Sequence, residues 1–321
     1  MALQETKASH GLSMASVRKR PRKEPDTAGF NTGDFQTLLL LPIFLVLAMC
    51  VSEARWHRGC IFLARFVAPA PAGGKTSLWK GSGIQDVVRA RAFQLEHYVQ
   101  VVKERLTGWR AHVVLEGGEH LVRAKVAQDG AVLWVAHFCF NALASKMALQ
   151  AHGNRVHHIS RAEHGFSKSR FGMTFLNPIR IGAEARHLAS RIVIDRKDRA
   201  LAMHAALRAL KNGDFVSITA GAWEGQLISE VMIDGRVLEL STGAPRLAAL
   251  AHCPLLPVFV VRDEMTSEIR VIIEAPLAIN PALPRDTMIE SVATQFAEMH
   301  QKYISRYPHQ WRDWEKLQTR L

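Results

Sequence analysis

The sequence predicts an α/β protein in which helices flank one mixed sheet. Short apolar stretches typical of buried strands alternate with stretches in which apolar residues recur at helical spacing. Alternation of this kind favours a single domain built around a sheet. Hydrophobic residues make up 48% of the 321 residues, which is enough for a substantial core.

The composition favours an anionic partner and a reducing compartment. A formal net charge of +12 predicts attraction to nucleic acid, to an acidic protein or to a membrane surface. The basic residues are spread along the chain and form no recognised nucleic-acid module, so we expect no nucleic-acid binding. The four cysteines show no C-x-x-C spacing, which indicates neither a zinc site nor a disulfide framework. We therefore expect no metal.

The amino-terminal quarter of the chain predicts a membrane anchor. Residues 1–34 are polar and basic and are expected to form a disordered tail. Residues 35–67 begin with an apolar run, interrupted by Gln36 and Pro42, that is marginal for spanning a hydrocarbon core of about 30 Å. The run is followed by mixed arginine and aromatic residues, which suit the membrane interface. A secretory signal is the weaker alternative, because the basic cluster stands well back from the apolar run.

Residues 68–83 are rich in Pro, Gly and Ser and predict a linker, after which residues 84–321 are expected to form the folded domain. Apolar spacing predicts helices in this domain at 87–106, 120–127, 142–151, 198–211, 243–251 and 286–305. Strands are expected at 131–136, 156–159, 192–194, 215–219, 231–233, 255–261 and 269–274.

The stretch from Ala131 to Leu143 is the best candidate for the centre of a functional site. Its apolar strand ends abruptly in His137, and a helix-compatible stretch begins at Asn141. Open α/β sheets bind their ligands at the carboxyl ends of the strands. A histidine that caps the strand through a backbone hydrogen bond is the alternative, but the features below favour a catalytic histidine.

Five segments carry a resemblance to a known family. They are 115–121 with 130–138, then 195–198 with 207–214, then Thr242-Gly243-Ala244 with Leu247-Ala248, then Pro257-Val258, and finally Tyr307-Pro308 with Gln310, Trp311 and Trp314. In this order they resemble the late acyltransferases of lipid A biosynthesis, in the lysophospholipid acyltransferase superfamily. The resemblance implies a single glycerophosphate-acyltransferase-like domain behind a hydrophobic anchor.

The same resemblance implies a reaction and a location. A fatty acyl group would move from a thioester of acyl carrier protein or coenzyme A to a hydroxyl or amine of a lipid or small molecule. The thioester is a co-substrate, and no further cofactor is expected. The protein would act at the cytoplasmic face of the inner membrane, in contact with anionic lipids.

The family's catalytic motif is H-x-x-x-x-[DE], in which a carboxylate orients the histidine that acts as base. With His137 as the histidine, the fifth following position is Ala142 rather than an acid. The neighbouring Asn141 is the expected substitute, because an amide oxygen can orient an imidazole ring. His158 and Glu163 match the motif after a different strand and remain an alternative catalytic pair.

Substrate-binding residues are also expected from the resemblance. Arg180, Arg186 and Arg191 lie in the region where arginines of this superfamily contact phosphate, and Arg186 or Arg191 is expected to make this contact, since guanidinium groups bind phosphate oxygens bidentately. Glu224 would replace an acidic residue that the family carries after the strand at 215–219, and Gly243 belongs to the family's Thr-Gly pair. The missing acid leaves a second hypothesis, in which the chain is a catalytically impaired relative that binds lipid or acyl carrier as an accessory protein.

Overall fold

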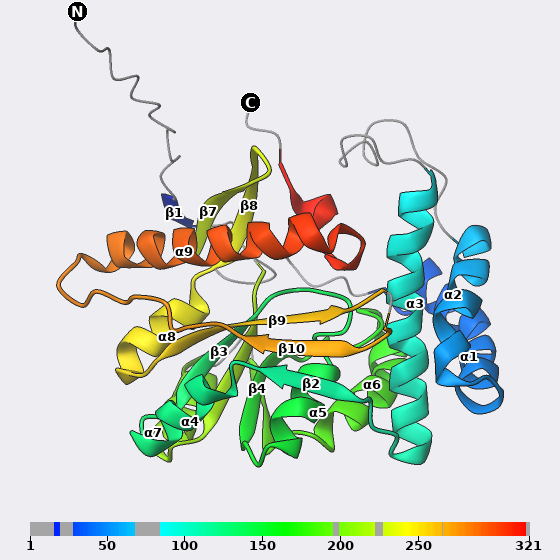
Figure 1. Ribbon diagram of the computed structural model, residues 1–321, viewed down its shortest axis with the longest axis horizontal. Helices are drawn as coiled ribbons and strands as arrows, with labels where there is room; N and C mark the ends of the chain where they lie inside the picture. Colours follow the sequence, from blue (N-terminus) through cyan, green and yellow to red (C-terminus); the bar gives the residue numbers. More distant parts are fainter. Residues whose placement is uncertain are drawn as a thin grey trace, which may run out of the picture.

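The computed structural model describes residues 16–19, 28–67, 84–194, 199–221, 227–264 and 266–318. A seven-stranded mixed sheet with the order β2-β10-β9-β3-β6-β4-β5 lies at the centre of the fold, with helices on both sides (Figure 1). This architecture confirms the predicted fold class. The strands are β2 (Val113–Glu116), β3 (Ala131–Val135), β4 (Val156–Arg161), β5 (Ser190–Ile194), β6 (Phe215–Thr219), β9 (Leu255–Arg262) and β10 (Ile269–Ile273).

Five neighbouring strands run parallel. They are β9, β3, β6, β4 and β5, whereas β10 is antiparallel to β9 and pairs in parallel with β2. Helix α5 (Ala144–Ala151) connects β3 to β4, and α7 (Arg199–Lys211) connects β5 to β6. The carboxyl ends of the five parallel strands meet at one edge of the sheet. The edge is the expected place for a ligand.

Strand β3 divides the hydrophobic core into two layers. Its residues are all buried, and successive side chains point to opposite faces of the sheet. Val132 and Trp134 pack in the cluster that contains α7, α8 (Gly243–Ala251) and α9 (Arg285–Arg306). Leu133 and Val135 pack in the cluster on the other face, which contains α5. Burial on both faces explains why the strand is a continuous apolar run.

Helices α1 (Thr32–Cys50) and α2 (Glu53–Val67) pack against α3 (Ile84–Thr107), which lies between them and the sheet (Figure 1). The start of α1 is fixed by a capping box, in which Asn31 and Asp34 exchange hydrogen bonds between side chain and backbone. One face of α1 is buried, through residues such as Phe44 and Ala48. By length and composition α1 is apolar enough to cross a membrane.

Several segments differ from the expectations from sequence, including β2 and three further segments of the chain before β5. Ser16–Lys19, in the tail expected to be disordered, forms β1, which pairs with β7 (Leu227–Ile233) in a small sheet completed by β8 (Arg236–Ser241). The pairing is supported by ion pairs from Arg18 to Glu230 and Glu239. A π-helix at Gly172–Leu176 and α6 (Asn177–Ala185) were not expected either. Residues 68–83, which were expected to form a linker, lie outside the described residues. Helix α4 (Gly118–Val126) follows β2.

The carboxyl-terminal segment after α9 lies across the ends of β3 and β9. Phe138 and Trp311 form an antiparallel bridge, and the backbone NH of Arg312 donates to the carbonyl of His137 at 3.1 Å. The Gln310 side chain is fully buried and bonds both backbone groups of Arg262 at the end of β9. The end of the chain is thus fixed beside the residues that follow β3.

Candidate active site

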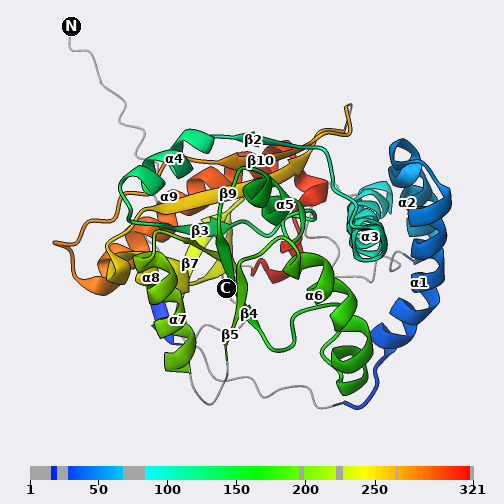
Figure 2. The same ribbon diagram turned by 90° about the horizontal axis from the view of Figure 1, so that it is seen from below.

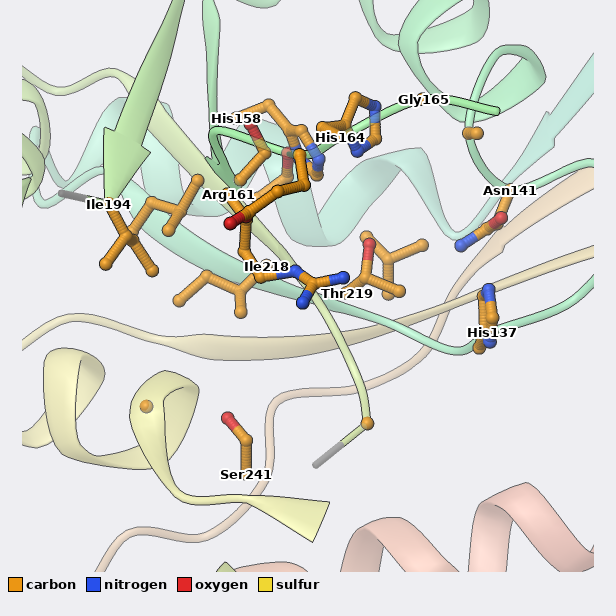
Figure 3. A pocket seen from close by; sticks show the side chains of 18 of the residues that line it. His137, Asn141, His158, Arg161, His164, Gly165, Ile194, Ile218, Thr219 and Ser241 are labelled. Atoms are coloured by element: carbon orange, nitrogen blue, oxygen red, sulfur yellow. Dashed lines mark hydrogen bonds between the residues drawn. The ribbon is translucent and has the colours of Figure 1, made fainter. Parts of the chain in front are cut away.

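A cavity of about 1030 Å³ opens at the carboxyl ends of β3, β4 and β6. His137, Asn141, His158 and His164 line it, and Figure 3 shows His137 and Asn141 close together at one side. Apolar side chains contribute another part of the wall, among them Ile159, Ile194, Met203, Ile218 and Leu227. His137 follows the central strand β3, as the sequence predicts, and its side chain lines this cavity.

The carboxylate partner of His137 is Asp313. Nδ1 of His137 lies 2.7 Å from Oδ1 of Asp313, and the two groups are 13% and 3% exposed. Lys316 forms a second ion pair with the same carboxylate. Asp313 reaches this position because the terminal segment is fixed beside Phe138 by its bridge to Trp311. A histidine held by a buried carboxylate is the arrangement that acyl transfer requires.

The electrostatics of this pair keep the imidazole of His137 neutral. Burial lowers the pKa of His137 to about 4, although Asp313 opposes the shift, so the imidazole is neutral at pH 7. Burial also works against ionisation of Asp313, but the charges and hydrogen bonds of His137 and Lys316 hold the pKa of this carboxyl below its usual range. Burial lowers the pKa of Lys316 to about 8, which leaves the ammonium mostly charged at pH 7. The result is a neutral imidazole beside a carboxylate.

Asn141 and Ala142 line the cavity but do not provide the carboxylate. Asn141 is buried, and its backbone NH donates to the carbonyl of Phe138 at 3.3 Å. Ala142 is 7% exposed. Nδ1 of His137 contacts Asp313 in this structure, and the orienting role expected for Asn141 stays a prediction. Asn141 remains beside the histidine, where it faces the cavity (Figure 3).

A second cluster of charged groups forms the far wall of the cavity, around the buried carboxylate of Glu184. Arg180 Nε lies 2.7 Å from Oε1, His164 Nε2 lies 2.9 Å from Oε2, and Lys146 forms an ion pair with Oε2. Burial opposes the charge of Glu184, but Lys146, His164 and Arg180 hold its pKa well below the usual range. The side chains of Lys146 and Arg180 thus contact the same carboxylate. The cluster keeps a surplus of positive charge next to the cavity.

His158 belongs to this wall and has a different partner from the one its motif suggests. Its Nδ1 lies 2.9 Å from the hydroxyl oxygen of Ser217 on β6. Burial, with Lys146 as the next contribution, lowers its pKa well below the usual range. His158, His164 and Glu184 bring ligand atoms within 4.8 Å of one another, a spacing that suits a metal. Both oxygens of Glu184 are bonded to cations, however, so the cluster suits an anion better than a metal ion.

The other predicted site residues are distributed differently. Gly243 starts α8 and lines the cavity. Arg186 donates to the backbone carbonyls of Glu104 and Arg105, and Arg191 donates to the hydroxyl of Ser160 at 2.6 Å. Both arginines lie outside the set of described residues that line the cavity, so their phosphate-binding role stays a prediction. Glu224 lies outside the described residues.

Cations at other positions do line the cavity. Among its described lining residues, seven are Lys or Arg, and Glu163 is the one acidic side chain. The seven are Lys19, Lys146, Arg161, Lys168, Arg180, Arg246 and Arg312. Arg180 lies in the region where the resemblance implies phosphate-binding arginines, whereas the other six were not predicted as part of the site, because they come from separate strands, helices and loops. Asp313 was missed as well, although it lies between Trp311 and Trp314 in a segment that carried the family resemblance.

The structure thus combines a mixed α/β sheet with a histidine–carboxylate pair at the end of a central strand and a partly apolar cavity beside it. This arrangement is typical of an enzyme site that can carry out general acid–base chemistry. The chain belongs to the bacterial lipid A biosynthesis acyltransferase family, whose model matches residues 83–317. This family is one of acyl transfer in lipid biosynthesis. No curated protein matches the chain.

Proposed function

We propose that this protein transfers a fatty acyl group from a thioester to a hydroxyl or amine of a lipid or small-molecule acceptor. The observation that carries the proposal is the 2.7 Å contact between His137 and Asp313. A proton on Nδ1 donates to the carboxylate, which places the lone pair of the ring on Nε2. The tautomer needed for a general base is thereby selected.

The reaction then follows from general acid–base chemistry. Nε2 of His137 takes the proton of the acceptor hydroxyl or amine as its oxygen or nitrogen attacks the thioester carbonyl. The new ester or amide bond forms as the bond to sulfur breaks. Asp313 stabilises the imidazolium form of His137 after it has taken the proton from the acceptor. The proton then passes from His137 to the leaving thiolate. No cofactor besides the thioester takes part.

The acyl chain of the donor fits the apolar part of the cavity. The wall formed by Ile159, Ile194, Met203, Ile218 and Leu227 suits a fatty acyl chain, because burial of apolar surface stabilises the complex. Acyl carrier protein is acidic, and the net charge of +12 favours its approach. Acyl-coenzyme A, with its phosphates, is favoured by the same charge.

The membrane is the proposed location of the reaction, at the cytoplasmic face of the inner membrane. Helix α1 leaves large apolar side chains exposed, including Phe35, Leu39 and Val46 at 56%, 58% and 56%. A soluble surface rarely carries so many neighbouring apolar groups, whereas a lipid surface would cover them. The basic charge of the chain favours anionic lipids as the partner.

The accessory-protein hypothesis loses its main support in this structure. It depended on the absence of an acid next to His137, and Asp313 supplies one. Mass spectrometry of lipids and small metabolites from cells with and without the gene tests the proposal. We expect an acylated species that disappears with the gene and is not restored by a His137→Ala variant. Identical profiles in all strains would contradict the proposed acyl transfer.

A further inference from the structure

Three phenylalanine rings form an exposed cluster beside the start of α1. The centroids of Phe30 and Phe171 lie 5.1 Å apart, and those of Phe171 and Phe175 lie 5.0 Å apart. Phe30 is 49% exposed and Phe175 is 62% exposed, and Met173 on the same turn is 36% exposed. We call Phe30, Phe171 and Phe175 the aromatic triplet. Its exposure has an energetic cost in water, which a lipid or protein partner would remove.

The triplet joins two segments that are far apart in the sequence. The backbone NH of Arg170 donates to the carbonyl of Ala28 at 3.1 Å, and that of Phe171 donates to Gly29 at 3.0 Å. Figure 2 shows the start of α1 beside the helical turn that leads into α6. The contact is close, because a Cβ added to Gly172 would lie 2.7 Å from a carboxylate oxygen of Asp34 in the first turn of α1. The triplet and the start of α1 are therefore packed directly against each other.

The triplet extends the apolar face of α1. Phe35 and Leu38 follow Phe30 on the exposed side of the first turns of this helix, at 56% and 37% exposure. Lys168 and Arg170 flank the triplet and are exposed. Aromatic side chains with neighbouring cations are typical of elements that lie in the headgroup region of an anionic bilayer. The short π-helix that carries Phe175 is a rare element that is frequent at functional sites.

Both segments of this junction also reach the cavity. Asn31 and Gly33, at the start of α1, line it, and so do Ser167 and Lys168 on the loop before the π-helix. The exposed triplet thus lies next to residues that border the substrate space. A membrane that covers the triplet would lie beside this side of the cavity.

We infer that the aromatic triplet is a second membrane-binding element, which inserts into the interface of an anionic bilayer and holds this side of the cavity against the lipid surface. The inference rests on the proposed acyl transfer at a membrane and specifies how the site meets its lipid substrate. Helix α1 supplies the broad apolar contact, and the triplet fixes the orientation of the domain. A lipid acceptor then reaches His137 without crossing water.

Depth-dependent fluorescence quenching tests this inference on the full chain. In a Cys50→Ser background, which removes the exposed native thiol, an environment-sensitive dye is attached at Phe175→Cys, at Met49→Cys on α1, or at Leu250→Cys on α8. Leu250 is 58% exposed and serves as the matched control. Vesicles contain phosphatidylethanolamine and phosphatidylglycerol with brominated acyl chains. We expect quenching at positions 49 and 175 and none at 250.

Two results would overturn the inference. Quenching at position 49 without quenching at 175 would assign membrane binding to α1 alone. The second result is a dye at position 175 that is shielded from water equally with and without vesicles, in a protein that sediments as a dimer. It would assign the triplet to a contact between two copies of the chain.

Substitution of the triplet provides a second, functional readout. We expect a Phe30→Ser/Phe175→Ser variant to bind anionic vesicles about tenfold more weakly, because two interfacial aromatic groups are lost. A Leu201→Ser/Leu250→Ser variant, altered at exposed leucines of α7 and α8, should bind like the wild type. Acyl transfer to a short-chain soluble acceptor should be unchanged in both. Unchanged vesicle affinity in the triplet variant would contradict the inference. A protein that shows quenching at positions 49 and 175 but no acyl transfer would count against the proposed function instead.

Discussion

Nδ1 of His137 and the carboxylate of Asp313 lie 2.7 Å apart, although 176 positions separate the two residues in the sequence. The H-x-x-x-x-[DE] motif expected from the resemblance would place an acid at position 142, where this chain has Ala142. Here the carboxylate comes from the end of the chain instead. Tertiary structure rather than local spacing thus brings a carboxylate to the ring of His137.

We predict that Asp313→Asn lowers kcat by about two to four orders of magnitude, because the amide no longer fixes the tautomer of His137 or stabilises its cation. KM should change little, since Asp313 is buried behind the histidine. Steady-state kinetics with the thioester donor measure both constants. Asp286→Asn, at an exposed acid of α9, is the matched control and should behave like the wild type. Equal activity of the two variants would show that Asp313 has no positioning role.

Ala142→Glu should give no gain in activity, because the ring nitrogen that a new carboxylate would bind already contacts Asp313. Ala142 is buried, so the larger side chain should destabilise the fold, by about 1–3 kcal/mol for an overpacked position. Acyl-transfer rates and urea unfolding measure the two effects. A clear rise in rate would mean that Asp313 does not fulfil the role assigned to it.

His300 should make the fold sensitive to acid. Burial lowers its pKa from 6.5 to about 4, and neither ring nitrogen has a hydrogen-bond partner among the described residues. Between pH 6.5 and pH 4, His300 is protonated in the unfolded chain but neutral in the folded chain. The free energy of unfolding therefore decreases as the pH falls toward 4. The loss between pH 7 and pH 5 should be about 2 kcal/mol for this group.

A His300→Phe variant should lose less stability than the wild type over the same pH range, since Phe fits among the neighbouring rings of Phe138, Phe296 and Trp311 without a titrating group. Urea midpoints at pH 7 and pH 5 measure the difference. If both proteins lost the same free energy of unfolding, His300 would not be a source of the acid sensitivity.

Lys146→Met should raise KM for an anionic acceptor by about tenfold, because a buried cation of the cavity wall is removed. Activity toward the same acceptor without its phosphate groups should change much less. Lys125→Met, at a residue that bonds the backbone of Gly153 on the surface, is the control. Thermal unfolding verifies that the variants are folded. An equal rise in KM for both acceptors would indicate a structural role for Lys146 instead of recognition of charge.

The exposed face of α1 should provide most of the membrane affinity. Leu39→Ser/Val46→Ser should shift the protein toward the soluble fraction with vesicles, because both residues are exposed and apolar. Val126→Ser, at a 79% exposed position on α4, is the matched control. Deletion of the region is a poorer test, since α1 and α2 share a core cluster with Val99 and other residues of α3. Unchanged sedimentation of the double variant would contradict the anchor.

Much of the fold was predictable because local pattern determines it. The strand expected at 131–136 is observed at Ala131–Val135, and the helix expected at 243–251 has the same bounds in the structure. Both segments have clear apolar periodicity. The π-helix and α6 escaped prediction because Gly172 and the Asn177-Pro178 pair are typical of loops, and only tertiary contacts fix them as helix.

The site was predictable only in part, for a physical reason. His137 is marked by its place at the end of an apolar strand, which is a local signal. Asp313 has no such signal, because its role depends on the pairing of Trp311 with Phe138 across the end of the sheet. The cations of the cavity wall are also brought together only by folding, as Lys146 and Arg180 are around Glu184.

The most direct test of the account is acyl transfer by the purified full-length protein in anionic vesicles, with acyl carrier protein or coenzyme A thioesters and a lipid extract as acceptor. The account predicts a labelled product with wild type. His137→Ala should form it at least about 10²-fold more slowly, as expected for loss of a general base, while circular dichroism shows an unchanged fold. Transfer at the wild-type rate by folded His137→Ala would contradict the central claim that His137, held by Asp313, is the catalytic base.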